Sequence, residues 1–134
     1  MKKCVAICLL FCCLFMFCSC ENYVSSYKAV GLVKSKTSHS VRVKFHSLEG
    51  SLVFTLQKSG KGTEGDIQYA IECEEGELHL YYVTTSGVKE ELAHVKAGES
   101  LESVGGYVEG GKRVKVIIEA QEKTKGKVSV ELDH

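Results

Sequence analysis

The sequence predicts an all-β fold, a single antiparallel β-sandwich of about seven to nine strands built from hairpins after an N-terminal signal segment. Three observations carry this prediction. Apolar and polar residues alternate with period two from His39 onward. Glycine supplies the turns, with 13 residues, because proline is absent. The roughly 95 to 114 residues that follow the signal segment are enough for one apolar core.

The first twenty residues have the pattern of a secretion signal. Lys2 and Lys3 precede an unbroken apolar run over residues 4–18, and the run ends at Ser19-Cys20. A membrane-spanning helix needs about 20 apolar residues, whereas the apolar part of a signal peptide is shorter. The segment resembles the lipobox of bacterial lipoproteins, in which a small residue precedes a cysteine that is acylated and becomes the new N-terminus.

By position, the resemblance assigns lipidation to Cys20. It implies a signal peptide at 1–19 and a lipidated cysteine and tether at 20–38, and the alternation that starts at His39 predicts a β-sandwich domain at 39–134. The tether contains a possible first edge strand at 29–33. The implied partner is the membrane, reached through palmitate-like acyl chains on the outer side of the cytoplasmic membrane or in the outer membrane. An ordinary cleaved signal and an uncleaved anchor are the alternatives for this segment.

Cysteine usage changes once the signal is removed. The chain has seven cysteines, and five of them lie in the predicted signal peptide. Acylation of Cys20 then leaves only Cys73, so no intramolecular disulfide is expected. Cys73 falls in the apolar phase of a predicted strand, which indicates a buried structural thiol.

The charge balance excludes several classes of partner. Without Lys2 and Lys3, the 17 basic residues fall to 15 against 17 acidic residues. This balance gives no basic footprint for nucleic acid and no polybasic patch for lipid headgroups. We therefore expect no nucleic-acid partner.

The alternation predicts three β-hairpins in succession. In each of them, two alternating segments flank a turn and place their apolar side chains on one face. The expected hairpins pair residues 41–45 with 52–56, residues 67–73 with 78–82, and residues 114–118 with 128–132.

The third hairpin also has a patterned solvent face. Its register places opposite charges across from one another, which would fix the pairing of the two strands. The expected pairs are Arg113 with Asp133, Lys115 with Glu131, and Glu119 with Lys127.

Residues 84–112 are the least regular part of the chain. Val88, Leu92 and Val95 have helical spacing, so we expect at most one short helix here. Residues 101–108 fit an irregular strand interrupted by glycine.

The sequence offers no set of nucleophile, base and orienting acid, so we expect no enzyme activity and no cofactor. The five histidines are not at zinc-site spacings, so no metal site is predicted. We expect His79 to lie on the solvent face opposite Glu72. An acidic hairpin tip could hold a divalent cation weakly, through Glu72, Glu74, Glu75 and Glu77.

The favoured function is a non-catalytic binding or interaction module of the cell envelope with a protein or glycan partner. Glycan recognition commonly uses exposed aromatic rings, and Tyr81 and Tyr107 are the weak candidates for ligand binding. Two alternatives stay open. One is a small envelope enzyme or an accessory, inhibitor-like factor, and the other is a structural lipoprotein that self-associates through an edge strand.

Overall fold

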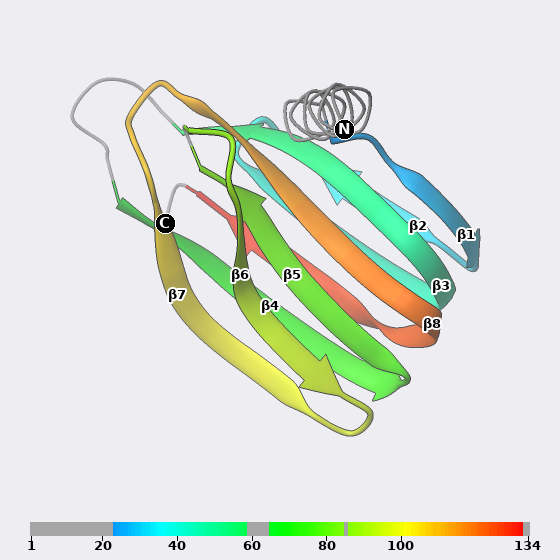
Figure 1. The fold of residues 1–134 in the computed structure, drawn as a ribbon. Helices are drawn as coiled ribbons and strands as arrows, with labels where there is room; N and C mark the ends of the chain where they lie inside the picture. The colour runs from blue at the N-terminus through cyan, green and yellow to red at the C-terminus, as the bar shows by residue number, and fades with distance from the viewer. Residues whose placement is uncertain (1–22, 59–64, 85, 133–134) are drawn as a thin grey trace, which may run out of the picture.

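The computed structural model describes residues 23–58, 65–84 and 86–132, which form eight antiparallel strands in one sheet (Figure 1). The predicted all-β sandwich is confirmed. Within the described ranges there is no helix, and thus none that could cross a membrane. The strands are β1 (Ser26–Val30), β2 (Val33–Lys36), β3 (Ser40–Gln57), β4 (Gly65–Glu75), β5 (Glu77–Val83), β6 (Lys89–Lys96), β7 (Ser100–Val108) and β8 (Arg113–Glu131).

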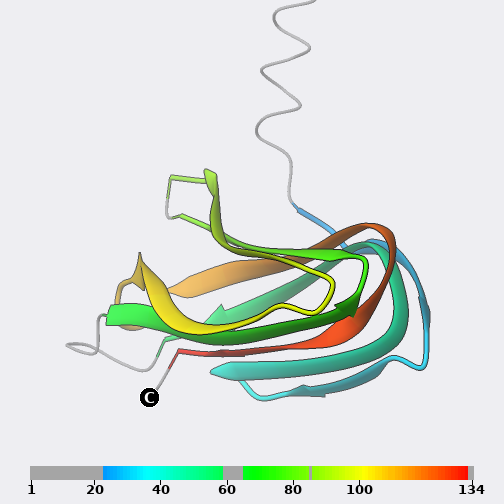
Figure 2. The same cartoon turned by 90° about the horizontal axis from the view of Figure 1, so that it is seen from below.

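Two long strands, β3 and β8, fold the sheet into a sandwich. Both curve round one side of the molecule and continue from one layer into the other (Figure 2). Layer A consists of β2, the first half of β3, the second half of β8, β4 and β7. Layer B consists of β1, the second half of β3, the first half of β8, β5 and β6.

The prediction of hairpins at 41–56 and 114–132 is wrong. Each of these segments forms one continuous bent strand, β3 or β8, and the two strands pair with each other. A hairpin and a strand bent round a core both place alternate side chains on the inside. The period-two alternation therefore cannot distinguish them.

β-Bulges produce the bends, which lie opposite each other in the paired strands β3 and β8. The register between β3 and β8 shifts between Phe45 and Leu48 and again between Leu48 and Gly50. Gly50 has a φ of 113°, and a Cβ on it would lie 2.3 Å from the Ser26 carbonyl oxygen. On β8, a Cβ on Gly126 would lie 2.2 Å from the Glu72 carbonyl oxygen. Glycine is required at both positions because neighbouring backbone passes so close.

The predicted hairpin 67–73/78–82 is also wrong, although its turn is present. The turn at Gly76 leads from β4 in layer A to β5 in layer B, so the two strands face each other across the core. Thr124 in the bend of β8 holds this turn, and its hydroxyl donates to the Glu122 carbonyl at 2.8 Å. The same hydroxyl accepts from the Glu77 backbone N–H at 3.3 Å.

The predicted inward-facing residues are all buried. These side chains from both layers form one core, whose members are Val41, Val43, Phe45, Leu52, Phe54, Leu56, Ile67, Tyr69, Ile71, Cys73, Leu78, Leu80, Tyr82, Val114, Val116, Ile118, Val128, Val130 and Leu132.

The short helix considered for 84–112 is replaced by strands β6 and β7. A β-bulge explains the misleading spacing, because Leu80 pairs with Ala93 while Tyr81 pairs with Glu91, which leaves Leu92 as the extra residue. The carbonyl of Leu92 accepts a hydrogen bond from the Tyr69 hydroxyl at 2.8 Å. The irregular strand predicted at 101–108 is confirmed as part of β7.

At the N-terminal end, the apolar stretch 29–33 contributes to two edge strands rather than one. β1 pairs with β3 in layer B, and β2 pairs with β3 in layer A.

Two of the charge pairs predicted within β8, Lys115 with Glu131 and Glu119 with Lys127, are not formed. Glu119 pairs with Lys89 at 2.7 Å, and Lys127 pairs with Glu72 at 3.3 Å, because the two ends of β8 lie in different layers. The pair of Arg113 with Asp133 lies outside the described residues.

Candidate functional site

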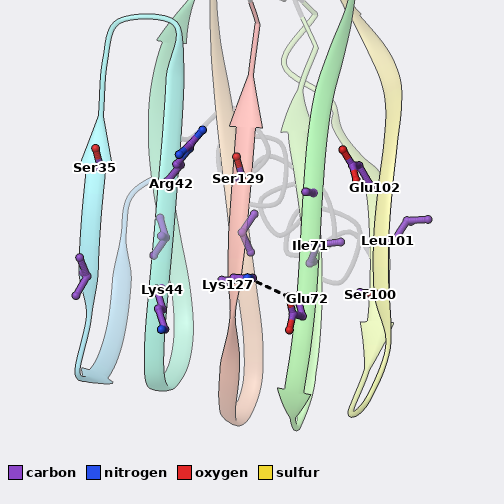
Figure 3. A pocket seen from close by; sticks show the side chains of 14 residues that line it. Ser35, Arg42, Lys44, Ile71, Glu72, Ser100, Leu101, Glu102, Lys127 and Ser129 are labelled. Atoms are coloured by element: carbon purple, nitrogen blue, oxygen red, sulfur yellow. Dashed lines mark ion pairs between the residues drawn. The ribbon is translucent and has the colours of Figure 1, made fainter.

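A groove of about 590 Å³ crosses the outer face of layer A. Figure 3 shows its 14 lining residues, which come from β2, β3, β8, β4 and β7 in that spatial order. A volume of this size lies within the range of ligand pockets, about 300 to 1,000 Å³.

The groove is built from rows of outward-facing side chains that the strand registers align. One row runs from β2 to β7 through Ser35, Arg42, Ser129, Ala70 and Glu102. The parallel row runs through Val33, Lys44, Lys127, Glu72 and Ser100.

The hollow shape follows from side-chain size. Ser129 and Ala70 occupy the middle of the first row on β8 and β4, and both are half-buried. Long side chains flank them, with Arg42 on one side and Glu102 on the other, and both are exposed. Small residues between long ones leave a trough over the central strands.

The charges along the groove are uneven. Arg42 and Lys44 on β3 form no ion pair with any described residue, and Lys44 lies directly across from Lys127. Lys127 is neutralised by Glu72 at 3.3 Å, as the dashed line in Figure 3 shows. The β3 side of the groove is thus positive, whereas Glu102 on β7 is acidic.

The groove combines charged and hydrogen-bonding groups with exposed aliphatic side chains, Val33 on β2 and Leu101 on β7. Its 14 described lining residues include no histidine, cysteine or aromatic residue. Serine hydroxyls, three cationic side chains and two carboxylates are the polar groups available. Such a surface can hold a hydrophilic ligand by hydrogen bonds and ion pairs.

The structure places Tyr81 on β5 in layer B, outside the groove. Its ring is half-buried, lies 5.8 Å from the stacked His79 ring, and has the Lys89 ammonium 4.1 Å from its centroid. Burial raises the pKa of the Tyr81 hydroxyl, and nearby Glu119 raises it further. Lys89 therefore covers a face of the ring that a sugar would need for stacking.

Tyr107 is 53% exposed near the end of β7, also outside the groove. The two tyrosines belong to strands in different layers, and no shared platform follows from their positions. The role of either tyrosine in ligand binding stays a prediction.

Of the two cysteines expected in the mature chain, the structure describes only Cys73. Cys20, the expected lipidation site, lies outside the described residues. Cys73 is buried, and its thiol donates to the Glu75 carbonyl at 3.3 Å, as expected for a structural thiol. Burial raises the pKa of this thiol above the ordinary value of 9.0.

The predicted pairing of His79 with Glu72 is wrong. His79 lies across from His94 and Glu119 in layer B, whereas Glu72 lies in the groove of layer A. The glutamates of the predicted acidic tip do not form one cluster. Glu72 pairs with Lys127, and Glu74 pairs with Lys125 at 3.1 Å.

Sequence reasoning missed the groove residues because they carry no motif. The available signal was a set of outward positions in which small residues replace long ones, at Ala70 and Ser129. That signal acquires meaning only when β4 and β8 are known to be neighbours.

Comparisons with known proteins find similar chains among the solved structures. No protein-family model and no curated protein matches the chain. Solved structures of family 29 carbohydrate binding modules are similar. A CBM29-2 mutant has 11% identity and a TM-score of 0.41, over 84% of this chain and 76% of that one.

Two further CBM29-2 mutants were solved in complex with oligosaccharides. The mannohexaose complex has 11% identity and a TM-score of 0.39, over 80% of this chain and 77% of that one. The cellulohexaose complex has 11% identity and a TM-score of 0.39, over 82% of this chain and 89% of that one. These TM-scores are low, so the ligand of this chain has to be argued from its own residues.

Proposed function

We propose that this chain is a non-catalytic binding module of the bacterial cell envelope, tethered by lipid at Cys20, that holds an anionic glycan in the groove of layer A. The observation that carries the proposal is the alignment of Arg42 and Lys44, without ion-pair partners among the described residues, beside a trough over Ser129 and Ala70. A carboxylate or sulfate on the ligand would neutralise them.

The dimensions and chemistry of the groove support an extended hydrophilic ligand. The trough crosses five strands, and serines on β2, β8 and β7 offer hydroxyls along it. Aromatic stacking is not available among the lining residues, so affinity would depend on charge and would fall with added salt.

Thermal unfolding of residues 21–134 with and without oligosaccharides tests ligand binding. Every described strand and core residue lies between Ser26 and Leu132, so this fragment contains the whole described fold. We expect uronate-bearing or sulfated oligosaccharides to stabilise it. At 100 times the dissociation constant, a ligand adds about 2.7 kcal/mol, which raises Tm by several degrees.

Matched variants locate the ligand. The double variant Arg42→Ala with Lys44→Ala should lose the shift, whereas Lys28→Ala on β1 should keep it. Binding that is equal in all three proteins, or absent for every anionic oligosaccharide, would contradict the groove. The tether has its own test, since a Cys20→Ala chain that still incorporates labelled fatty acid would overturn lipidation there.

A further inference from the structure

Three potential metal ligands converge on the outer face of layer B, on the neighbouring strands β5 and β6 (Figure 1). Glu77 and His79 point to the same side because they are two residues apart on β5, and His94 lies directly across from His79. The Nε2 atom of His79 lies 3.6 Å from Glu77 Oε1, and His94 Nε2 contacts the same oxygen. One ligand atom from each residue lies within 4.8 Å of the others.

The surroundings of His79 orient its ring for coordination. Its Nδ1 atom is buried, has no hydrogen-bond partner among the described residues, and lies 3.5 Å from Glu91 Oε2. A histidine that binds metal through one nitrogen commonly directs the other toward a carboxylate. This arrangement leaves Nε2 of His79 facing Glu77 and His94.

The tautomers of the histidines decide how they meet Glu77. In one tautomer His94 Nε2 carries a hydrogen and donates to the carboxylate, and in the other its lone pair is available to a cation. The two imidazole rings lie face to face, with centroids 4.0 Å apart and planes that differ by 11°, so both Nε2 atoms are presented to the same Glu77 oxygen. One dication could therefore be bound by all three residues at once.

We propose that Glu77, His79 and His94 bind one divalent transition-metal ion of the zinc class. Two imidazoles and one carboxylate are a known zinc ligand set, with a fourth position left for water. Nitrogen ligands favour such an ion over Mg²⁺ or Ca²⁺, which prefer oxygen.

The open side of the proposed metal site has room and charge for the ion. A hollow of about 330 Å³ lies beside it, lined by Glu77, His79, Gln121 and Glu122. Glu122 and Glu91 add negative charge near the three ligands, and neither belongs to the ligand set itself. This metal site lies in layer B and is independent of the groove in layer A, so either proposal can fail alone.

Zinc titration of tag-free residues 21–134, followed by calorimetry and by histidine NMR, tests the metal site. We expect one Zn²⁺ per chain, with shifts of the His79 and His94 ring signals and none at His46. Glu77→Gln and His94→Ala should each weaken binding more than about tenfold, and Glu91→Gln about tenfold by loosening His79. Glu77→Gln preserves side-chain size, so it tests the site even if a histidine variant folds poorly.

His46→Ala is the matched control, because it removes an exposed histidine of β3 and should leave the affinity unchanged. Ca²⁺ and Mg²⁺ should produce no histidine shifts. The absence of saturable Zn²⁺ binding would overturn the proposal and leave a proton-bridged pair of Glu77 with His94. Equal Zn²⁺ affinity in wild type, Glu77→Gln and His94→Ala would overturn it as well.

Discussion

The outer faces of layers A and B use the same alternating pattern in opposite ways. On layer B, Lys89 contacts both Glu119 and Tyr81, and Glu77 contacts both histidines. On layer A, Lys127 pairs with Glu72, whereas Arg42 and Lys44 have no ion-pair partner among the described residues.

The difference between the faces follows from side-chain size on the central strands. Layer A has Ala70 and Ser129 in the middle of its groove. Layer B has His79 and Tyr81 in the comparable central position on β5, and their rings stack with each other. Large side chains fill one face with mutual contacts, whereas small ones leave the other face open for a ligand.

The largest effect should come from Gly126→Val, which breaks the bend that carries β8 from one face to the other. The new side chain would meet the Glu72 carbonyl oxygen at 2.2 Å, so backbone has to move. We expect a loss of about 3 kcal/mol or more in urea unfolding, the upper range for overpacking. Gly65→Ala is the control, because its Cβ meets nothing within 4 Å, and a change within about 0.5 kcal/mol is expected. Equal stability of the two variants would show that the close approach at Gly126 is unimportant.

Double-mutant cycles on one ion pair from each face sharpen the comparison at a smaller scale. Lys89 and Glu119 on layer B are 2.7 Å apart, with side chains 31% and 25% exposed. Lys127 and Glu72 on layer A are 3.3 Å apart, with side chains 62% and 43% exposed. We expect a coupling of about 0.5 to 1 kcal/mol for the first pair and below about 0.3 kcal/mol for the second, because solvent screens exposed charges. A stronger coupling for Lys127 with Glu72 than for Lys89 with Glu119 would contradict the conclusion that side-chain contacts are tighter on layer B.

The smallest effect at neutral pH concerns Cys73 in the core between the faces. Burial raises the pKa of its thiol, so the unfolded chain loses this proton near pH 9.0 while the folded chain keeps it. Stability is therefore fully present below about pH 9 and should fall as the pH rises toward the folded pKa. Urea unfolding from about pH 8 to 10 should show a steeper decline for wild type than for Cys73→Ala. Parallel curves would contradict this, since the tyrosine contributions are common to both proteins.

Much of the interior was predictable from residue type alone. The alternation at Val41, Val43 and Phe45, for instance, placed all three side chains in the core, and Cys73 was assigned to the same interior. Period-two patterning reports which side of a strand faces apolar surroundings. It does so whether the strand ends in a turn or continues round a bend.

Strand partners were not predictable in this way. Lys127 was expected opposite Glu119, yet its partner is Glu72 from a strand more than fifty residues earlier. The helical spacing of Leu92 with its neighbours likewise came from a bulge that the Tyr69 hydroxyl stabilises from another strand. Such contacts depend on residues distant in sequence, which local patterns do not report.

The sequence by itself determined the all-β class, the inward face of the strands and the buried thiol, because burial of apolar surface acts on each residue's own chemistry. Only the tertiary structure decided that β3 and β8 bend between two layers. The pairing of β3 with β8, of β8 with β4 and of β4 with β7 brings Arg42, Ser129, Ala70 and Glu102 into one groove. The pairing of β5 with β6 in the other layer brings His79 beside His94. Both assemblies arise from hydrogen-bonded registers between distant strands, and close backbone packing at Gly50 and Gly126 allows the bend on which they depend.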